Sequence, residues 1–251
     1  MKFKAFTKIL FILIALCLSG CAATKVKEGS NPAKRTINDV LPEGEKPLLI
    51  ANDPWEGYNR WMYDFNAKFD RYIFLPAVSA YQVLPGFART GIHNFFRNFR
   101  EFKNILNALL QGNPAQSGRS LGRLAINTTI GVAGLFDPAT NFGLNYQEED
   151  FGQTLGVWGV GPGPFVVLPI LGPSTLRDAL SLIPDTVVHP VYEPTAWLYE
   201  LDSEELAALA IVDAINRRSG IGFRYYGMGS PFEYQWIRMM WLEYRQLQIK
   251  K

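Results

Sequence analysis

The sequence has few of the residues that enzymes and metal-binding proteins use for their chemistry. Its 251 residues include only two cysteines, Cys17 and Cys21, and two histidines, His93 and His189. The histidines lie far apart and neither has a companion at the spacing of metal ligands, so we expect each to be a surface or capping residue. A Gly-x-Ser-x-Gly motif, which a serine nucleophile of the α/β-hydrolase class would need, is also missing. We therefore predict no metal site, no cofactor and no enzymatic activity.

Two other motifs resemble functional sites only superficially. Residues 159–163 (GVGPG) look like a phosphate-binding loop, but Pro162 and Pro164 remove backbone amides and no Gly-Lys-Ser/Thr follows. The acidic run 148–150 (EED) could in principle supply paired carboxylates, but neighbouring side chains on a helix point in different directions. We expect a solvated helix start at this run.

Lysine and arginine are missing from a 53-residue stretch, Leu124 to Leu176. Inside it, Phe151–Thr175 carries no charge of either sign and would be long enough to cross a bilayer, which takes roughly 20 apolar residues in a helix. It cannot form such a helix, because its prolines and glycines break one. Irregular backbone at membrane depth needs a protein cover or a water-filled cavity. On composition alone, we weigh a deep apolar position equally with a soluble core hairpin.

Residues 1–20 predict a signal peptide, because basic residues precede an apolar run from Ile9 to Leu18. Residues 18–21 (LSGC) resemble a bacterial lipobox, in which Cys21 receives acyl chains and becomes the new N-terminus. Several acyl chains give stable anchoring, and in families with this signal Ala22 favours the outer membrane. An ordinary cleavage site with a chance cysteine is the weaker alternative.

The remaining chain divides into a tether and one helical body. Residues 21–52 form the acylated N-terminus and a polar, flexible tether. Residues 53–251 contain no linker-like segment and predict one compact helical domain. Without the three lysines of the signal, 22 basic residues face 23 acidic ones, so bulk charge gives no basis for nucleic-acid binding.

Helix start signals recur at Asp53-Pro54, Asn113-Pro114 and Ser230-Pro231, each followed by an acid or amide two residues after the proline. Strand signals are limited to 165–168 and 187–188. We therefore predict a mainly α fold with a Gly/Pro-rich irregular segment.

Two more helices follow the central segment. A short one should begin at Thr175 and end before Pro184, and another should run from Leu206 to Arg218, opened by Asp202 and Glu205.

A long stripe of apolar residues recurs at helical spacing between the first two start signals. Core packing is the favoured interpretation for most of the stripe, although an amphipathic helix facing lipid would have the same pattern. The stripe comprises Ile92, Phe95, Phe96, Phe99, Phe102, Leu106, Leu109 and Leu110.

The chain resembles the MlaA (VacJ) family of outer-membrane lipoproteins from about Asp53 to Arg218. The central match is highly specific, and weaker matches lie near residues 53–66 and 110–114. The central motifs are 150–156 (DFGQTLG), 159–165 (GVGPGPF), 168–169 (LP), 171–175 (LGPST) and 177–178 (RD). Phe165 replaces a tyrosine expected in many relatives, and Ser230 replaces an aspartate.

The resemblance implies a ring-like helical body embedded in the outer membrane and facing the periplasm, with an amphipathic channel through it. Such proteins accept phospholipids misplaced in the outer leaflet, pass them to a periplasmic carrier and associate with trimeric porins. For this chain we expect the lipid path to include Leu155, Trp158, Gly159, Gly161, Gly163, Phe165, Val167 and Leu168. Gly161 and Gly163 would allow close backbone approach, and the apolar side chains would meet acyl chains.

Two alternatives stay open. The chain could be a structural or interaction lipoprotein in which the glycine-proline segment only packs a core. A lipid-modifying enzyme ranks third, because the sequence offers no nucleophile for it.

Overall fold

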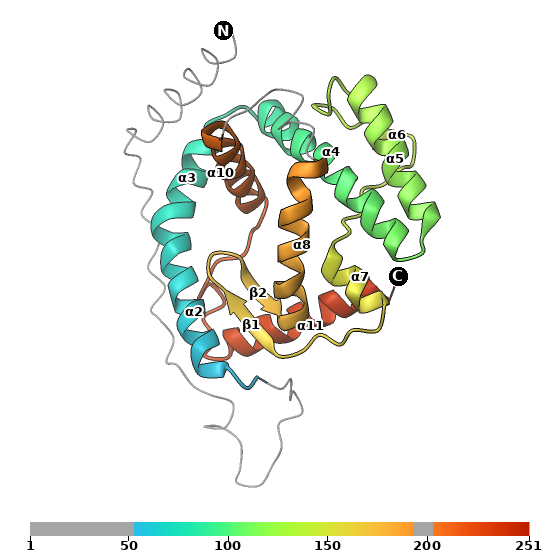
Figure 1. Cartoon of the computed structure of the whole chain (residues 1–251). Coiled ribbons are helices and arrows are strands. Elements are labelled where there is room, and N and C mark those ends of the chain that lie inside the picture. Colours follow the sequence, from blue (N-terminus) through green and yellow to red (C-terminus); the bar gives the residue numbers. More distant parts are fainter. Residues whose placement is uncertain (1–52, 193–202, 251) are drawn as a thin grey trace. The chain divides into compact units, whose positions relative to one another are not determined.

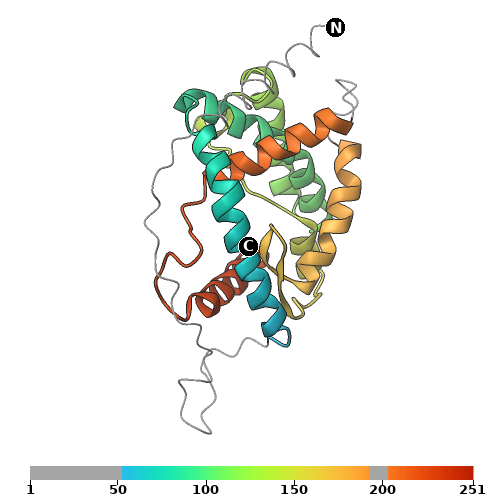
Figure 2. The same ribbon diagram turned by 90° about the vertical axis from the view of Figure 1, so that its left-hand side faces the viewer.

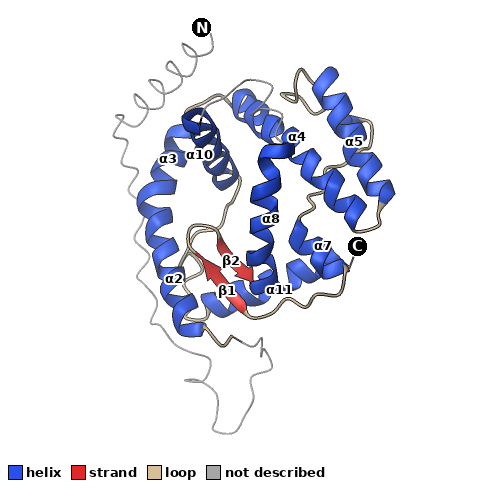
Figure 3. Cartoon of the chain, viewed as in Figure 1, coloured by secondary structure: helices blue, strands red, loops and turns tan. Residues whose placement is uncertain are grey.

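The structure, a computed structural model, describes residues 53–192 and 203–250 (Figure 1). Most of these residues are helical and only one short hairpin is extended (Figure 3), which confirms the mainly α class. Cys21, the tether and Asp202 lie outside the described residues. The described residues form two compact units, which we call the hairpin unit and the α4–α5 unit. The prediction of one domain over 53–251 stays a prediction.

The hairpin unit contains the described residues of three stretches of the chain. The first stretch ends at Asp70, the second runs from Glu149 to Thr186, and the third begins at Phe223. Its hairpin joins β1 (Phe165–Leu168) to β2 (Gly172–Thr175) in antiparallel register, with Phe165 opposite Thr175. The helices are α2 (Glu56–Phe69), α7 (Phe151–Val157), the first part of α8 (Leu176–Tyr192) and α11 (Glu233–Ile249).

In both views the hairpin lies beside α2 and α11, and β1 contacts α2 while β2 contacts α11 (Figures 1 and 2). Its small core brings together residues from three distant stretches of the sequence. The buried members are Met62, Tyr63, Phe165, Val167 and Tyr234.

The α4–α5 unit contains the described residues of 71–148 and 187–222. Helix α4 (Gly86–Leu110) packs lengthwise against α5 (Pro114–Thr129), and α5 also contacts the short α6 (Pro138–Asn141). Helix α10 (Ser203–Ser219) contacts α4 and α3 (Leu75–Tyr81). Between α2 and α3 the chain forms one π-helical stretch, η2 (Asp70–Phe74).

The helix start signals give one confirmed cap and two corrections. Asn113 caps α5, since its side chain accepts a hydrogen bond from the Gln116 amide at 3.0 Å. Asp53 does not cap α2, because its carboxylate instead accepts hydrogen bonds from Asn59, Tyr234 and Arg238. Ser230 does not cap α11 either.

At α11 the proline comes before the helix and not within its first turn. Helix α11 begins at Glu233 without a side-chain cap, and the Glu233 carboxylate accepts hydrogen bonds from the amides of Tyr226 and Met228. The carboxylates of Asp53 and Glu233 therefore accept hydrogen bonds from groups other than the first amides of their helices.

The segment after β2 also differs from prediction. The Thr175 hydroxyl accepts a hydrogen bond from the Asp178 amide at 3.2 Å, as the capping signal predicts. The helix does not end before Pro184, because α8 continues to Tyr192. A proline inside a helix removes one backbone donor and clashes with the preceding turn, but it can bend the helix and need not end it. Residues 187–188 are consequently helical, and the prediction of an extended pair was wrong.

Candidate functional site

The charge-free segment 151–175 folds as a short helix, a loop and a hairpin, which confirms that it is not one membrane-crossing helix. Asp150 caps α7 by accepting a hydrogen bond from the Gln153 amide at 2.8 Å. The acidic run is therefore a helix start as predicted, but it is not solvated, because Glu149 is only 2% exposed. After α7, Gly159 adopts a φ of +89°, a conformation that few other residues tolerate.

Residues 158–164, which we call the glycine-proline loop, are hydrogen-bonded to the first turn of α8. The amides of Leu176 and Arg177 donate to the carbonyls of Pro164 and Pro162, at 2.9 and 3.1 Å. The Arg177 guanidinium also donates to the Val160 carbonyl at 3.3 Å. The loop is thus fixed to the protein by its backbone, while Trp158 and Val160 remain about half exposed.

Two asparagines of α2 complete the edge of β1. Asn59 accepts from the Val167 amide at 2.8 Å and donates to the Phe165 carbonyl at 3.0 Å. Asn66 accepts from the Ile170 amide at 2.7 Å and donates to the Leu168 carbonyl at 2.8 Å. Buried backbone groups need such partners, so α2 takes the place of a third strand. Both asparagines lie in the stretch 53–66, which resembles the family more weakly, and sequence reasoning did not find this role.

The predicted lipid-path residues fall into three groups. Phe165 and Val167 are only 2% and 1% exposed and belong to the small core of the hairpin unit, so their contact with acyl chains stays a prediction. Leu155 and Leu168 are half-buried. The exposed members, all in the glycine-proline loop, are Trp158, Gly159, Gly161 and Gly163.

The two loop glycines proposed for close approach also differ from each other. A Cβ atom on Gly161 would meet no protein atom within 4 Å, so no neighbouring residue requires a glycine there, and its place on the lipid path stays a prediction. Gly163 does need its small size, because its φ is +67° and a Cβ would lie 3.1 Å from Leu176.

The interior of the α4–α5 unit is polar. Arg123 is 2% exposed, and its guanidinium contacts Glu101 at 2.6 Å and Asp137 at 3.0 Å. Burial raises the pKa of Glu101, although hydrogen bonds from Asn104 and Arg123 oppose this effect. Other buried polar residues continue the same seam along both helices, namely Asn98, Asn104, Asn107, Gln116, Ser117, Ser120 and Asn127.

The outer side of α4 carries exposed apolar residues. Leu106, Leu109 and Leu110 are 42%, 54% and 48% exposed, and the aromatic residues of the stripe are only half-buried. Core packing was therefore the wrong interpretation of this stripe. A protein surface with many exposed large apolar side chains needs a non-aqueous or protein partner.

The described residues hold no group of three or more side chains suited to binding a metal ion. Across residues 53–192 and 203–250, no helix combines the length and apolar character needed to cross a membrane. His93 is exposed, as expected, and His189 is among the residues whose side chains are not described.

Comparisons with known proteins agree with the motif pattern. The family model of the MlaA lipoprotein matches residues 51–248, a stretch that includes parts of both units. An uncharacterized protein of Rickettsia prowazekii is 33% identical over 186 residues, which make up 73% of this chain and 72% of that protein. The intermembrane phospholipid transport system lipoprotein MlaA of Escherichia coli K12 is 42% identical over 132 residues, or 51% of this chain and 53% of that protein.

A solved structure gives the same result at the level of the fold. It comes from work on the structural basis for maintenance of bacterial outer membrane lipid asymmetry, and it covers 78% of this chain and 98% of its own length. The TM-score is 0.59 and the sequence identity is 31%. Because the family model spans most of the chain, this protein belongs to the MlaA lipoprotein family.

Proposed function

We propose that this protein is an outer-membrane lipoprotein that removes misplaced phospholipids from the outer leaflet. The lipids would pass through an amphipathic channel in a ring-like body embedded in the bilayer, and a periplasmic carrier would receive them. Acyl chains on Cys21 would hold the body at the membrane, and a trimeric porin would be a partner. This function involves no chemical reaction and keeps the outer membrane asymmetric.

The polar interior and apolar exterior of the α4–α5 unit carry the proposal. In water, the burial of Glu101, Arg123 and their polar neighbours would be costly, and exposed leucines would favour aggregation. In hydrocarbon the same distribution is favourable, because apolar side chains face lipid while polar groups satisfy one another. The names of the relatives, which refer to phospholipid transport and to outer membrane lipid asymmetry, support the substrate class.

The passage would be passive. A charged headgroup that crosses hydrocarbon unaided meets a barrier on the order of several kcal/mol or more. A path with polar character lowers this barrier while the acyl tails stay in an apolar environment. The glycine-proline loop exposes the apolar side chains of Trp158 and Val160 next to exposed glycine backbone, which is the mixed character that such a path needs.

Deletion of the gene in its native bacterium tests the proposal. We expect phospholipid to accumulate in the outer leaflet and the cells to become sensitive to detergent. Normal levels in a strain complemented with the intact gene are the control. Unchanged lipid asymmetry in the deletion strain would favour the alternative, a structural or interaction lipoprotein.

A further inference from the structure

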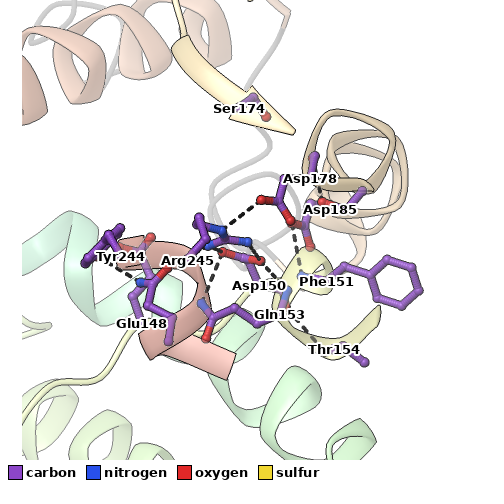
Figure 4. A network of polar contacts seen from close by, with 12 residues as sticks. Glu148, Asp150, Phe151, Gln153, Thr154, Ser174, Asp178, Asp185, Tyr244 and Arg245 are labelled. Atoms are coloured by element: carbon purple, nitrogen blue, oxygen red, sulfur yellow. Dashed lines mark hydrogen bonds and ion pairs between the residues drawn. The ribbon is translucent and has the colours of Figure 1, made fainter. Parts of the chain in front are cut away.

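One arginine of α11 joins the two ends of the charge-free segment. The Arg245 guanidinium donates from both terminal nitrogens to the Asp150 carboxylate, at 2.8 and 2.9 Å, and from Nε to Asp178 at 2.9 Å. Asp150 comes directly before residues 151–175, and Asp178 follows them closely. Figure 4 shows the guanidinium between the two carboxylates. Arg245 and Asp178 are 6% and 7% exposed, so the contact is built into the interior.

The contact continues to the glycine-proline loop. The other carboxylate oxygen of Asp178, Oδ1, accepts a hydrogen bond from Arg177 Nε at 2.9 Å. Arg177 also donates to the Val160 carbonyl. Charges therefore alternate from Asp150 through Arg245 and Asp178 to Arg177, and the series ends on the loop backbone. Each group depends on its neighbours, because a buried charge without a partner is unfavourable.

The glycines of the 150–156 motif make room for this arrangement. A Cβ atom on Gly152 would lie 2.5 Å from Asp178 Oδ1 and 2.9 Å from Arg245 Nη2. A Cβ atom on Gly156 would lie 3.0 Å from Arg177 Nη1 and 2.6 Å from Ile249 of α11. Helix α7 thus presents two small residues, one turn apart, to the arginines and to α11.

We propose that Arg245 is a positioning residue for lipid transport. It holds the glycine-proline loop in place by joining Asp150 and Asp178, the two carboxylates that flank residues 151–175. The proposal rests on the proposed function, and it gives α11 a specific task in the transport step. Arg245 itself does not contact lipid, and it acts through Asp178 and Arg177. Lysine cannot replace it fully, because a single ammonium lacks the planar fork that holds two carboxylates.

A spin label on the loop tests the proposal without relying on transport. Val160→Cys in a chain with Cys17→Ser and Cys21→Ser provides one thiol at a half-exposed site. In detergent micelles we expect an immobile label in the otherwise unchanged protein. Arg245→Gln should raise the mobile fraction roughly tenfold, as expected when one member of a buried ion pair is removed. Arg245→Lys should also make the label mobile.

Arg238→Gln is the matched control. Arg238 lies on the same helix, is 7% exposed and forms an ion pair with Asp53 at 2.9 Å. It is not part of the series of charges from Asp150 to Arg177. We expect this variant to lose stability while its label stays immobile. An immobile label in Arg245→Gln or Arg245→Lys, or an equally mobile label in Arg238→Gln, would overturn the proposal.

Transport is measured separately in cells with the native Cys21. Arg245→Gln should lower the removal of outer-leaflet phospholipid, whereas Arg238→Gln at equal protein level should not. Normal transport with a mobile loop would overturn the positioning role. If the unchanged protein moved no lipid, the proposed function would fail, and the label would still decide whether Arg245 holds the loop.

Discussion

At the scale of single residues, the glycines of the central segment have different tasks. Gly152 is closely surrounded by Asp178, Arg245 and Ser181, whereas Gly161 faces open space. We expect Gly152→Ala to lower the free energy of unfolding by about 1–3 kcal/mol, the usual cost of overpacking. Gly161→Ala is the matched control and should stay within about 0.5 kcal/mol of the unchanged protein. Thermal unfolding in detergent measures both, and equal midpoints would contradict this difference.

A large side chain at Gly161 tests the lipid path itself. Because a Cβ atom there meets nothing within 4 Å, Gly161→Trp should leave folding and protein level unchanged. The indole would occupy the surface of the glycine-proline loop, so we expect outer-leaflet phospholipid to rise toward the level of a deletion strain. Lipid asymmetry and protein level are measured together. Normal transport in this variant would remove Gly161 from the path.

The Asp150 carboxylate should make the hairpin unit sensitive to acid. Burial alone would raise the pKa of Asp150, but the hydrogen bonds and charge of Arg245 outweigh burial and hold the pKa well below its usual range. Arg245 also forms an ion pair with Asp178, so its positive charge acts on both carboxylates. Since the folded pKa is lowered, the stabilisation is present above the unfolded pKa of about 4 and is lost as pH falls further.

Asp150→Asn should therefore flatten this acid dependence. Asparagine still caps a helix, so the cap persists while the charge is removed. Between pH 5 and pH 2 we expect the unchanged protein to lose about 1–3 kcal/mol more stability than the variant. Unfolding midpoints in detergent at several pH values measure the difference. Parallel pH profiles would show that Asp150 does not couple stability to protonation.

At the scale of the elements, the α4–α5 pair depends on one buried cation. Arg123 forms ion pairs with Glu101 and Asp137, so Arg123→Leu would remove the guanidinium that both of these interior carboxylates contact. We expect a loss of about 3–5 kcal/mol. Arg119→Ala, on the exposed side of the same helix, should change stability by less than about 0.5 kcal/mol.

The measurement for this pair is chemical unfolding in detergent. The double variant Arg123→Leu with Glu101→Leu should recover part of the loss, because fewer uncompensated charges remain buried. If Arg123→Leu were as stable as Arg119→Ala, the polar seam would not hold the two helices together.

At the scale of the whole molecule, the exposed apolar side chains should bind the body to membranes without its anchor. We expect a Cys21→Ser protein, exported with a cleavable signal, to remain in the membrane fraction after a high-salt wash and to leave it only with detergent. A periplasmic protein carrying the native signal and lipobox is a control for anchoring alone. Release of the Cys21→Ser protein by salt would show that the body is peripheral.

The sequence predicted local features well and tertiary partners poorly. The Asn113 cap, the strand at 165–168 and the break-up of the charge-free segment followed from local backbone chemistry, and the structure confirms them. Asp53 failed as a cap because a capping pattern cannot show that Tyr234 and Arg238, which are distant in sequence, bind the side chain. Ser230 failed because its hydroxyl accepts from the Phe232 amide just before the helix. The role of Arg245 was also missed, since its carboxylate partners lie 95 and 67 positions away.

The sequence by itself determined the helical class, the impossibility of a continuous helix through residues 151–175, and the family. These depend on prolines, glycines and motifs, which act locally or can be compared directly. Only the tertiary structure decided which side of each helix is buried. Periodicity shows that α4 has an apolar and a polar side, but the same spacing fits both orientations. The polar side of α4 lies against α5, because Arg123 there finds Glu101, and the apolar side is left for the surroundings.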